Sequence, residues 1–245
     1  MKFAGIIPAR YQSTRFPGKP LAMIKNKPMI QWVYENASKA LGQVWVATDD
    51  ERIFEAVRAF GGNVVETLPT HQSGTDRCAE AARIVAKDTD FDVVVNIQGD
   101  EPFIKPEQIE VLKSCFQDET VDVATLVKKI ETEEELFNPN RPKVVMDAKR
   151  NALYFSRSPI PFMRGEQEAN WHVKHSFWAH IGLYAFRAEV LQQLTKLEQT
   201  PLELAESLEQ LRWLENGYKI KTAETSFRTI GIDTPEDLEA ALQLF

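Results

Sequence analysis

The stretch Phe3-Ala4-Gly5-Ile6-Ile7-Pro8-Ala9-Arg10 is a short apolar run that ends abruptly in proline and arginine. Such a run is typical of a buried strand that leads into a loop. The loop continues to Lys19 and contains Arg15, Pro17 and Gly18. In open α/β sheets ligands bind outside the carboxyl ends of the strands, and turn N–H groups with fixed cations favour phosphate. We therefore expect this loop to hold a polyanion.

The basic character of this loop is local. The first 34 residues contain no acidic side chain, whereas the 245-residue chain has a formal net charge of −7. The acidic balance argues against a nucleic-acid-binding protein, which usually presents a basic face. A locally basic loop suits a small anion, although a solvated surface loop would have the same composition.

Composition places the chain among globular proteins. Its 43% hydrophobic and 27% charged residues are ordinary for that class. No apolar run reaches the roughly 18–20 residues of a membrane helix, and the start of the sequence does not resemble a signal peptide. Cys78 and Cys115 lie in helix-like segments and predict buried thiols rather than a disulfide framework. We expect a cytoplasmic protein with neither a nucleic-acid nor a membrane partner.

Apolar runs alternate with helical patterns in the first half. We predict strands at 3–7, 43–48, 64–65 and 91–97, and helices at 28–41, 50–60, 76–86 and 106–116. This order indicates a parallel sheet with helices on both faces.

The second half changes character. We predict strands at 121–130, 143–147, 152–155 and 177–186, a hairpin turn at 148–151, a long proline-punctuated loop at 157–175, and a helix at 202–215 closed by Gly217. A last helix starts with Thr234 as N-cap, Pro235 as its first residue and Asp237 completing the cap. The simplest account is one domain with a mixed sheet, and the long loop is typical of a lid or a binding loop.

Three further segments carry candidate chemistry. Gln98-Gly99-Asp100-Glu101-Pro102 follows the most apolar strand, so Asp100 emerges where ligands bind and is a natural Mg2+ ligand; an Asx turn is the alternative. His71–Arg77 opens a helix whose N–H groups favour an anion or a base carbonyl, or are simply capped. Gly231–Asp237 is a further candidate, although it would be a good helix-capping sequence even without a function. Neither a P-loop nor a G-x-G-x-x-G fingerprint is present.

Together these segments resemble the 3-deoxy-manno-octulosonate (Kdo) cytidylyltransferases, also called CMP-Kdo synthetases. The matching motifs are Pro8–Tyr11, Gly18–Leu21, Ser73–Arg77, Asn96–Pro102, Asn138-Pro139, Ala152–Arg157, His180–Tyr184, Leu208–Arg212 and Asp233–Asp237. They cover nearly the whole chain in the expected order, and only Met163–Lys174 shows no clear family pattern.

The resemblance implies a fold and a reaction. The fold is α/β of the nucleotide-diphospho-sugar transferase type: a doubly wound, mixed but mostly parallel sheet in three α/β/α layers, usually as a homodimer. A single cytidylyltransferase domain over 1–245 would have a nucleotide-binding half at about 1–120 and a sugar-binding and dimerisation part at about 121–230. The substrates would be CTP and Kdo, the acidic sugar that joins lipid A to the lipopolysaccharide core, and the products CMP-Kdo and diphosphate.

The same resemblance assigns roles to individual residues. The catalytic set is Arg10, Lys19, Asp100 and Asp233, of which Asp100 and Asp233 would hold Mg2+. CTP would be bound by Ala9, Arg10, Arg15, Lys19, Ser73, Gly74, Arg77, Gln98 and Asp100. The sugar acid would be bound by Gln98, Arg157, His180, Tyr184, Glu209 and Gln210. No side chain stands out as a general base.

Other interpretations fit parts of this pattern. Tyr184 would equally suit the core, His180 is of a type often structural, and Glu209 with Gln210 would suit a solvated helix face. A CMP-sialic acid synthetase, or a cytidylyltransferase for a Kdo variant, would activate a similar sugar. A glycosyltransferase would need an Asp-x-Asp-like metal site, which Asp100-Glu101 matches poorly. A nucleotide-binding regulatory protein should have lost part of the charged set, which is complete here.

Overall fold

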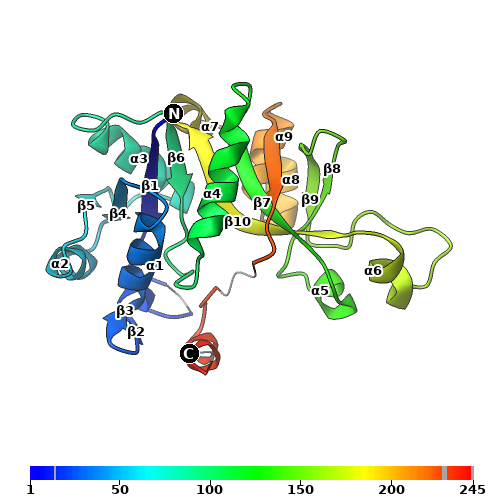
Figure 1. Cartoon of the computed structure of the whole chain (residues 1–245), viewed down its shortest axis with the longest axis horizontal. Coiled ribbons are helices and arrows are strands. Elements are labelled where there is room, and N and C mark those ends of the chain that lie inside the picture. The colour runs from blue at the N-terminus through cyan, green and yellow to red at the C-terminus, as the bar shows by residue number, and fades with distance from the viewer. Residues whose placement is uncertain (14, 228–230, 244–245) are drawn as a thin grey trace. The chain divides into compact units, whose positions relative to one another are not determined.

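The structure is a computed structural model that describes residues 1–13, 15–227 and 231–243 (Figure 1). The described chain forms two compact units. Unit 1 contains residues 1–110, 185–195 and those from 231 onward, and unit 2 contains residues 111–184 and 196–227. Every described helix is too short or too polar to cross a lipid bilayer.

Unit 1 is built on parallel strands in the order β6-β1-β4-β5. These strands are β1 (Phe3–Pro8), β4 (Val44–Thr48), β5 (Val64–Glu66) and β6 (Val93–Asn96), all at predicted places. Strand β1 pairs in parallel with both β4 and β6. Residues such as Ile6 and Val94 are fully buried, as expected for strands covered on both faces.

Helices α1 (Met29–Ser38), α2 (Glu51–Ala59), α3 (Gly74–Val85) and α4 (Pro106–Ser114) follow these strands as predicted. Helix α1 ends at Ser38, before the predicted closure at Gly42, because residues 39–41 form a turn that returns the chain to β4. The last helix, α10 (Pro235–Leu242), has the predicted capping box between Thr234 and Asp237.

Several short elements of unit 1 were not predicted from the sequence. They are the 3-10 turn Lys19–Leu21, the two-residue strands β2 (Met23–Ile24) and β3 (Lys27–Pro28), and helix α7 (Ala188–Leu194). A strand of two residues is too short for alternation to reveal it.

Unit 2 holds the mixed part of the sheet. Strand β7 (Val123–Lys129) lies between β10 (Trp178–Arg187) and β11 (Ile220–Glu224), and β11 runs parallel to β7. Strands β8 (Lys143–Met146) and β9 (Ala152–Ser156) form the predicted antiparallel hairpin. Strand β11 and the short helix α5 (Glu133–Phe137) were not predicted.

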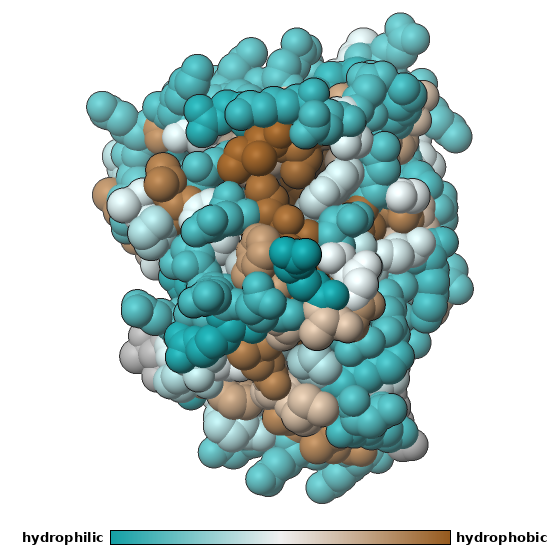
Figure 2. Space-filling view, turned by 90° about the vertical axis from the view of Figure 1, so that its left-hand side faces the viewer, coloured by the Kyte–Doolittle hydropathy of each residue, from teal (hydrophilic) through white to brown (hydrophobic). Residues whose placement is uncertain are grey.

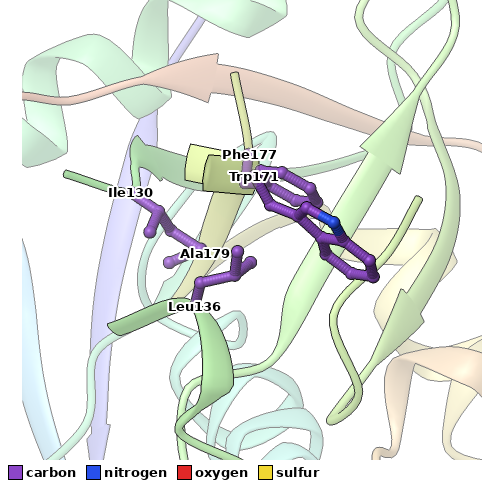
Figure 3. Packing of buried hydrophobic residues seen from close by; sticks show 5 residues of the cluster. All are labelled: Ile130, Leu136, Trp171, Phe177 and Ala179. Atoms are coloured by element: carbon purple, nitrogen blue, oxygen red, sulfur yellow. The ribbon is translucent and has the colours of Figure 1, made fainter. Parts of the chain in front are cut away.

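Two predictions for unit 2 were wrong in detail. The helix expected at 202–215 is two helices, α8 (Pro201–Glu206) and α9 (Gln210–Glu215), because Ser207 adopts a left-handed conformation with φ of 51°. The segment expected as loop at 157–175 ends in a 3-10 turn, Glu168–Asn170, and helix α6 (Trp171–Lys174). Trp171 anchors this segment by packing with Phe177 in a buried cluster (Figure 3).

The predicted α/β class with a mixed, mostly parallel sheet is confirmed. Both cysteines are buried, and burial raises the pKa of the Cys115 thiol to about 11. The face of the molecule in Figure 2 is mostly hydrophilic, with apolar residues gathered in small patches. Such scattered apolar exposure is ordinary for a folded protein surface.

Candidate active site

A cavity of about 360 Å³ lies in unit 1, at the carboxyl ends of β1 and β6. Its wall includes every residue predicted for CTP and metal: Ala9, Arg10, Arg15, Lys19, Ser73, Gly74, Arg77, Gln98, Asp100 and Asp233. The cavity is also lined by Ser13, His71 and Gln72. His71 and Gln72 belong to the segment His71–Arg77, but no role was predicted for them from the sequence. The structure therefore brings together residues from four separate stretches of the chain.

The pairing of β1 with β6 explains why these stretches meet. Adjacent parallel strands end at the same sheet edge, so the loop after Pro8 and the turn after Asn96 face one space. Gly99 lets the turn press against β1, because a Cβ at this position would lie 2.9 Å from the Pro8 carbonyl oxygen. Gly18 has φ of +73°, which lets the loop fold back on Tyr11.

Lys19 joins two aspartates that are far apart in sequence. Its Nζ donates to Asp100 Oδ2 at 2.7 Å and to Asp233 Oδ1 at 3.2 Å. Arg15 Nη2 lies 3.1 Å from the other oxygen of Asp233. The Lys19 side chain is only 14% exposed, so these charges interact with less screening than a surface pair. The two carboxylates thus converge on one cation.

The position of Asp233 is fixed by the segment around it. The Ile232 N–H donates to the Asp100 carbonyl oxygen at 2.9 Å, and the Ile232 side chain packs with Ile24 and Met29. The Asp233 N–H donates to Asp237, the residue that also completes the cap of α10. The capping sequence therefore also places the carboxylate of Asp233 in the cavity.

The start of α3 forms another wall. Ser73 is its N-cap: Ser73 Oγ accepts from the Asp76 N–H, and Asp76 accepts from the Ser73 N–H, each at 3.1 Å. The structural interpretation of this motif is therefore correct, and Ser73 and Gly74 line the cavity as well. Arg77 is buried, with its guanidinium 2.9 Å from Asp49 and donating to Thr67 Oγ1 at 2.6 Å. These contacts leave Arg77 little freedom to move.

Two carboxyl groups beside the cavity have shifted pKa values. Burial, and then the charge of Asp100, raises the pKa of Glu101 to about 8, so Glu101 is mainly protonated at pH 7. Burial opposes ionisation of Glu80, but hydrogen bonds from His71 and the Leu68 N–H hold its pKa below the ordinary value. A neutral Glu101 leaves Asp100 as the charged neighbour in this pair.

A second polar cluster lies in unit 2, around the predicted sugar-site residues of β10 and α9. The rings of His180 and Tyr184 are 5.2 Å apart, and His180 Nε2 lies 3.0 Å from Thr125 Oγ1. Burial and then the charge of Glu209 raise the pKa of Tyr184, and burial lowers the pKa of His180 to about 3. Gln210 is only 5% exposed, so the solvated-face alternative is wrong for it. Thr125 was not foreseen.

Arg157 has an extensive set of contacts in unit 2. Its Nε donates to the Glu206 carbonyl at 2.7 Å, its Nη1 to the Pro139 carbonyl and its Nη2 to the Ser207 carbonyl. The Glu206 carboxylate accepts from the Arg157 N–H and from Ser156 Oγ. Three of the five guanidinium N–H groups thus bind main-chain oxygens. Arg157 ties β9 to the break between α8 and α9, whatever else it binds.

Comparison with known proteins identifies the family. The Cytidylyltransferase family model matches residues 4–220. A 3-deoxy-manno-octulosonate cytidylyltransferase of Parabacteroides distasonis is 60% identical over 99% of this chain and 97% of its own length. The chain belongs to this family. A 3-deoxy-manno-octulosonate cytidylyltransferase of Bacteroides thetaiotaomicron is 59% identical over 98% of this chain and 97% of its own length.

A solved member of this cytidylyltransferase family has the same fold. It is CMP:2-keto-3-deoxy-manno-octonic acid synthetase in complex with CTP, 44% identical, with a TM-score of 0.90. The match covers 100% of this chain and 98% of that structure. The resemblance expected from the motifs is confirmed, and the chain is a nucleotidyltransferase.

Cytidylyltransferases generally use a divalent metal, and the cavity suits one. Mg2+ binds one or two protein carboxylates and completes its shell with water and substrate phosphate oxygens. Asp100 and Asp233 already converge on the single positive charge of Lys19. The two carboxylates therefore supply oxygen ligands of the kind that a divalent cation prefers, and both already contact one cationic group.

Proposed function

We propose that this chain activates Kdo for lipopolysaccharide synthesis: CTP and Kdo give CMP-Kdo and diphosphate. The observation that carries the proposal is the convergence of Lys19, Asp100 and Asp233 in a cavity bordered by further arginines. Cations there suit a triphosphate, and a carboxylate pair suits its metal. The relatives named above are the basis for choosing CTP and Kdo.

The reaction is an in-line displacement. The anomeric hydroxyl oxygen of the sugar forms a bond to the α-phosphorus of CTP, the bond from that phosphorus to the diphosphate breaks, and the hydroxyl proton passes to solvent. Such chemistry needs mainly positioning and neutralisation of charge. Arg10, Arg15 and Lys19 bind the triphosphate, where arginine grips two oxygens and lysine acts as a compact charge.

The remaining roles in unit 1 follow the same scheme. Ser73, Gly74 and Arg77, with Ala9, face the nucleoside of CTP. Mg2+ is the proposed metal, held by Asp100 and Asp233, and supplies neutralisation of the two anions and a lower pKa for the attacking hydroxyl. With such a metal bound, Lys19 would be available to contact the phosphate oxygens, because the two aspartates would no longer depend on its charge.

In unit 2, the residues proposed for the sugar acid are Arg157, His180, Tyr184, Glu209 and Gln210. A role for Gln98 of unit 1 in sugar binding stays a prediction from the family resemblance. Arg157 has guanidinium donors left after its main-chain contacts, and these suit the sugar carboxylate. Glu209 and Gln210 suit its hydroxyls. The chain is proposed to act in the cytoplasm as a homodimer, which light scattering on the purified protein tests directly.

The proposal is tested by incubating the purified chain with CTP, MgCl2 and one sugar acid, and measuring diphosphate release. Kdo, N-acetylneuraminic acid and an amino-substituted Kdo are compared at equal concentration. We expect Kdo to be used with the highest kcat/KM. Preference for either other sugar would replace the proposed substrate, and CTP binding by calorimetry without turnover of any sugar would refute an enzymatic role.

A further inference from the structure

Thr125 lies at the centre of the polar cluster in unit 2. It is fully buried on β7, and its hydroxyl oxygen is surrounded by polar atoms of β10. Thr125 Oγ1 is 2.9 Å from the Leu183 carbonyl oxygen, 3.1 Å from the Ile181 carbonyl oxygen and 3.0 Å from His180 Nε2. One threonine thus meets two main-chain acceptors and one imidazole nitrogen, and its hydroxyl also interacts with the Tyr184 side chain.

The number of protons available decides which group donates. A threonine hydroxyl has a single proton to donate and lone pairs to accept two more. A carbonyl oxygen can only accept, so the Thr125 proton must point to Ile181 or Leu183. The hydroxyl then has no proton left for His180 Nε2. The contact at 3.0 Å is a hydrogen bond only if Nε2 carries the proton and donates it.

We propose that Thr125 is a positioning residue that fixes His180 as the neutral Nε2–H tautomer, so that Nδ1 is left as a hydrogen-bond acceptor for a sugar hydroxyl. The role of His180 in sugar binding rests on the proposed function. The protonation of its ring does not, because it follows from the donation of the single Thr125 proton to a main-chain carbonyl.

The surroundings of His180 favour a neutral ring. Its ring packs at 5.1 Å against Phe155, edge to face, and at 5.2 Å against Tyr184. Burial in this aromatic environment disfavours the charged imidazolium, in agreement with the lowered pKa of His180.

The tautomer has a consequence for sugar recognition. A neutral imidazole that presents a lone pair accepts a hydroxyl proton, but it repels a carboxylate, which has no proton to offer. His180 therefore selects for a sugar hydroxyl at its Nδ1 and against the sugar carboxylate. The acid group must be met elsewhere, by a cation.

Nitrogen-15 NMR of the histidine-labelled chain tests the inference without turnover. At neutral pH we expect the His180 ring to show a protonated Nε2 with a one-bond coupling to hydrogen and an unprotonated Nδ1. The signals are assigned by their loss in His180→Asn. A protonated Nδ1, or a doubly protonated ring, in the unaltered chain would overturn the proposal.

Two variants separate the hydroxyl from the shape of the side chain. Thr125→Val keeps the shape and removes the hydroxyl, and Thr125→Ser keeps the hydroxyl. We expect Thr125→Val to lose the fixed tautomer and to raise the KM for Kdo about tenfold, the effect of leaving a buried donor unpaired, with the KM for CTP unchanged. Thr125→Ser should restore both. A Thr125→Val chain that keeps the tautomer would refute the assignment.

The matched control is Thr222→Val. Thr222 is buried on β11 directly opposite Thr125, and its hydroxyl contacts Met146 and the Arg150 carbonyl, not His180. We expect it to leave the His180 signals unchanged, and an equal change in both variants would show a general effect of burying valine instead. If the unaltered chain does not use Kdo, the proposed function fails, while the NMR result still decides the tautomer.

Discussion

Replacing Lys19 with methionine should destabilise the metal-free protein and make it more responsive to magnesium. The Lys19 ammonium is shared by Asp100 and Asp233, so its loss leaves two carboxylates that repel each other. A hydrogen bond to a charged group contributes about 1.5–3 kcal/mol when buried. Asp100 and Asp233 are 31% and 47% exposed, and exposed ion pairs contribute about 1 kcal/mol or less. We therefore expect a loss of about 1–2 kcal/mol.

The assay is thermal unfolding with and without MgCl2. For a chain of this size, about 1 kcal/mol shifts Tm by about 2–4 °C, so the metal-free variant should melt about 2–8 °C lower. A ligand at 100 times its Kd stabilises by about 2.7 kcal/mol. Because a divalent cation no longer competes with Lys19, Lys19→Met should gain more from magnesium than the unaltered chain does.

Lys27→Met is the control for the loss of one lysine. Lys27 contacts both oxygens of Glu35 at 2.7 and 2.9 Å and lies outside the cavity. It should lower Tm slightly and leave the response to magnesium unchanged. Equal responses of the two variants to magnesium, or an unchanged metal-free Tm for Lys19→Met, would refute the shared-cation reasoning.

Three further outcomes are expected. Asp100→Asn should lower kcat about 10²-fold or more in a diphosphate-release assay while circular dichroism stays native; near-normal turnover would remove Asp100 from the proposed metal site. Glu101 binds a proton up to about pH 8 when folded but only to about 4.5 when unfolded, so stability should fall as pH rises through this window. In urea unfolding, Glu101→Gln should remove about 2–3 kcal/mol of the decrease in unfolding free energy between about pH 5.5 and about pH 7.5. An unaltered dependence of the unfolding free energy on pH would contradict the raised pKa of Glu101. Ser207→Gly should be neutral or slightly stabilising and Ser207→Val destabilising by about 2 kcal/mol in urea, since Ser207 has φ of 51°; the reverse order would exclude backbone strain at this position.

The parallel strands and the cavity of unit 1 were predictable because their signals are local. An apolar run such as 91–97, followed by a glycine turn, marks both a buried strand and the carboxylate at its end. The convergence of Asp100 and Asp233 was available only from the family resemblance. The two aspartates are more than a hundred residues apart, so no sequence spacing predicts that they meet. The hydrogen bond from the Ile232 N–H that aligns them forms only in the folded chain.

The errors in unit 2 have a similar origin. The run 202–215 has helical composition throughout, and a serine does not by itself indicate a left-handed residue. The hydrogen bond to the Ser207 carbonyl comes from Arg157, which follows β9 and is distant in sequence. From the sequence, Trp171 is expected to be part of a polar loop, because its packing against Phe177 forms only in the folded chain. Thr125 was missed because a threonine in an apolar run is typical of any buried strand.

The route of the chain makes the cavity sensitive to damage far from the sheet. Asp233 is carried by the segment that begins at residue 231, and in the described structure Ile232 anchors it to the turn at Asp100 and to Ile24. A protease cut shortly before residue 231 would spare every strand, so the fragment would remain folded by spectroscopic criteria. Asp233 would then be held only by non-covalent contacts: its ion pairs with Lys19 and Arg15 and the packing of Ile232 and α10. Catalytic preparations of this chain should therefore be verified by intact mass, since a clipped sample would melt normally and work poorly.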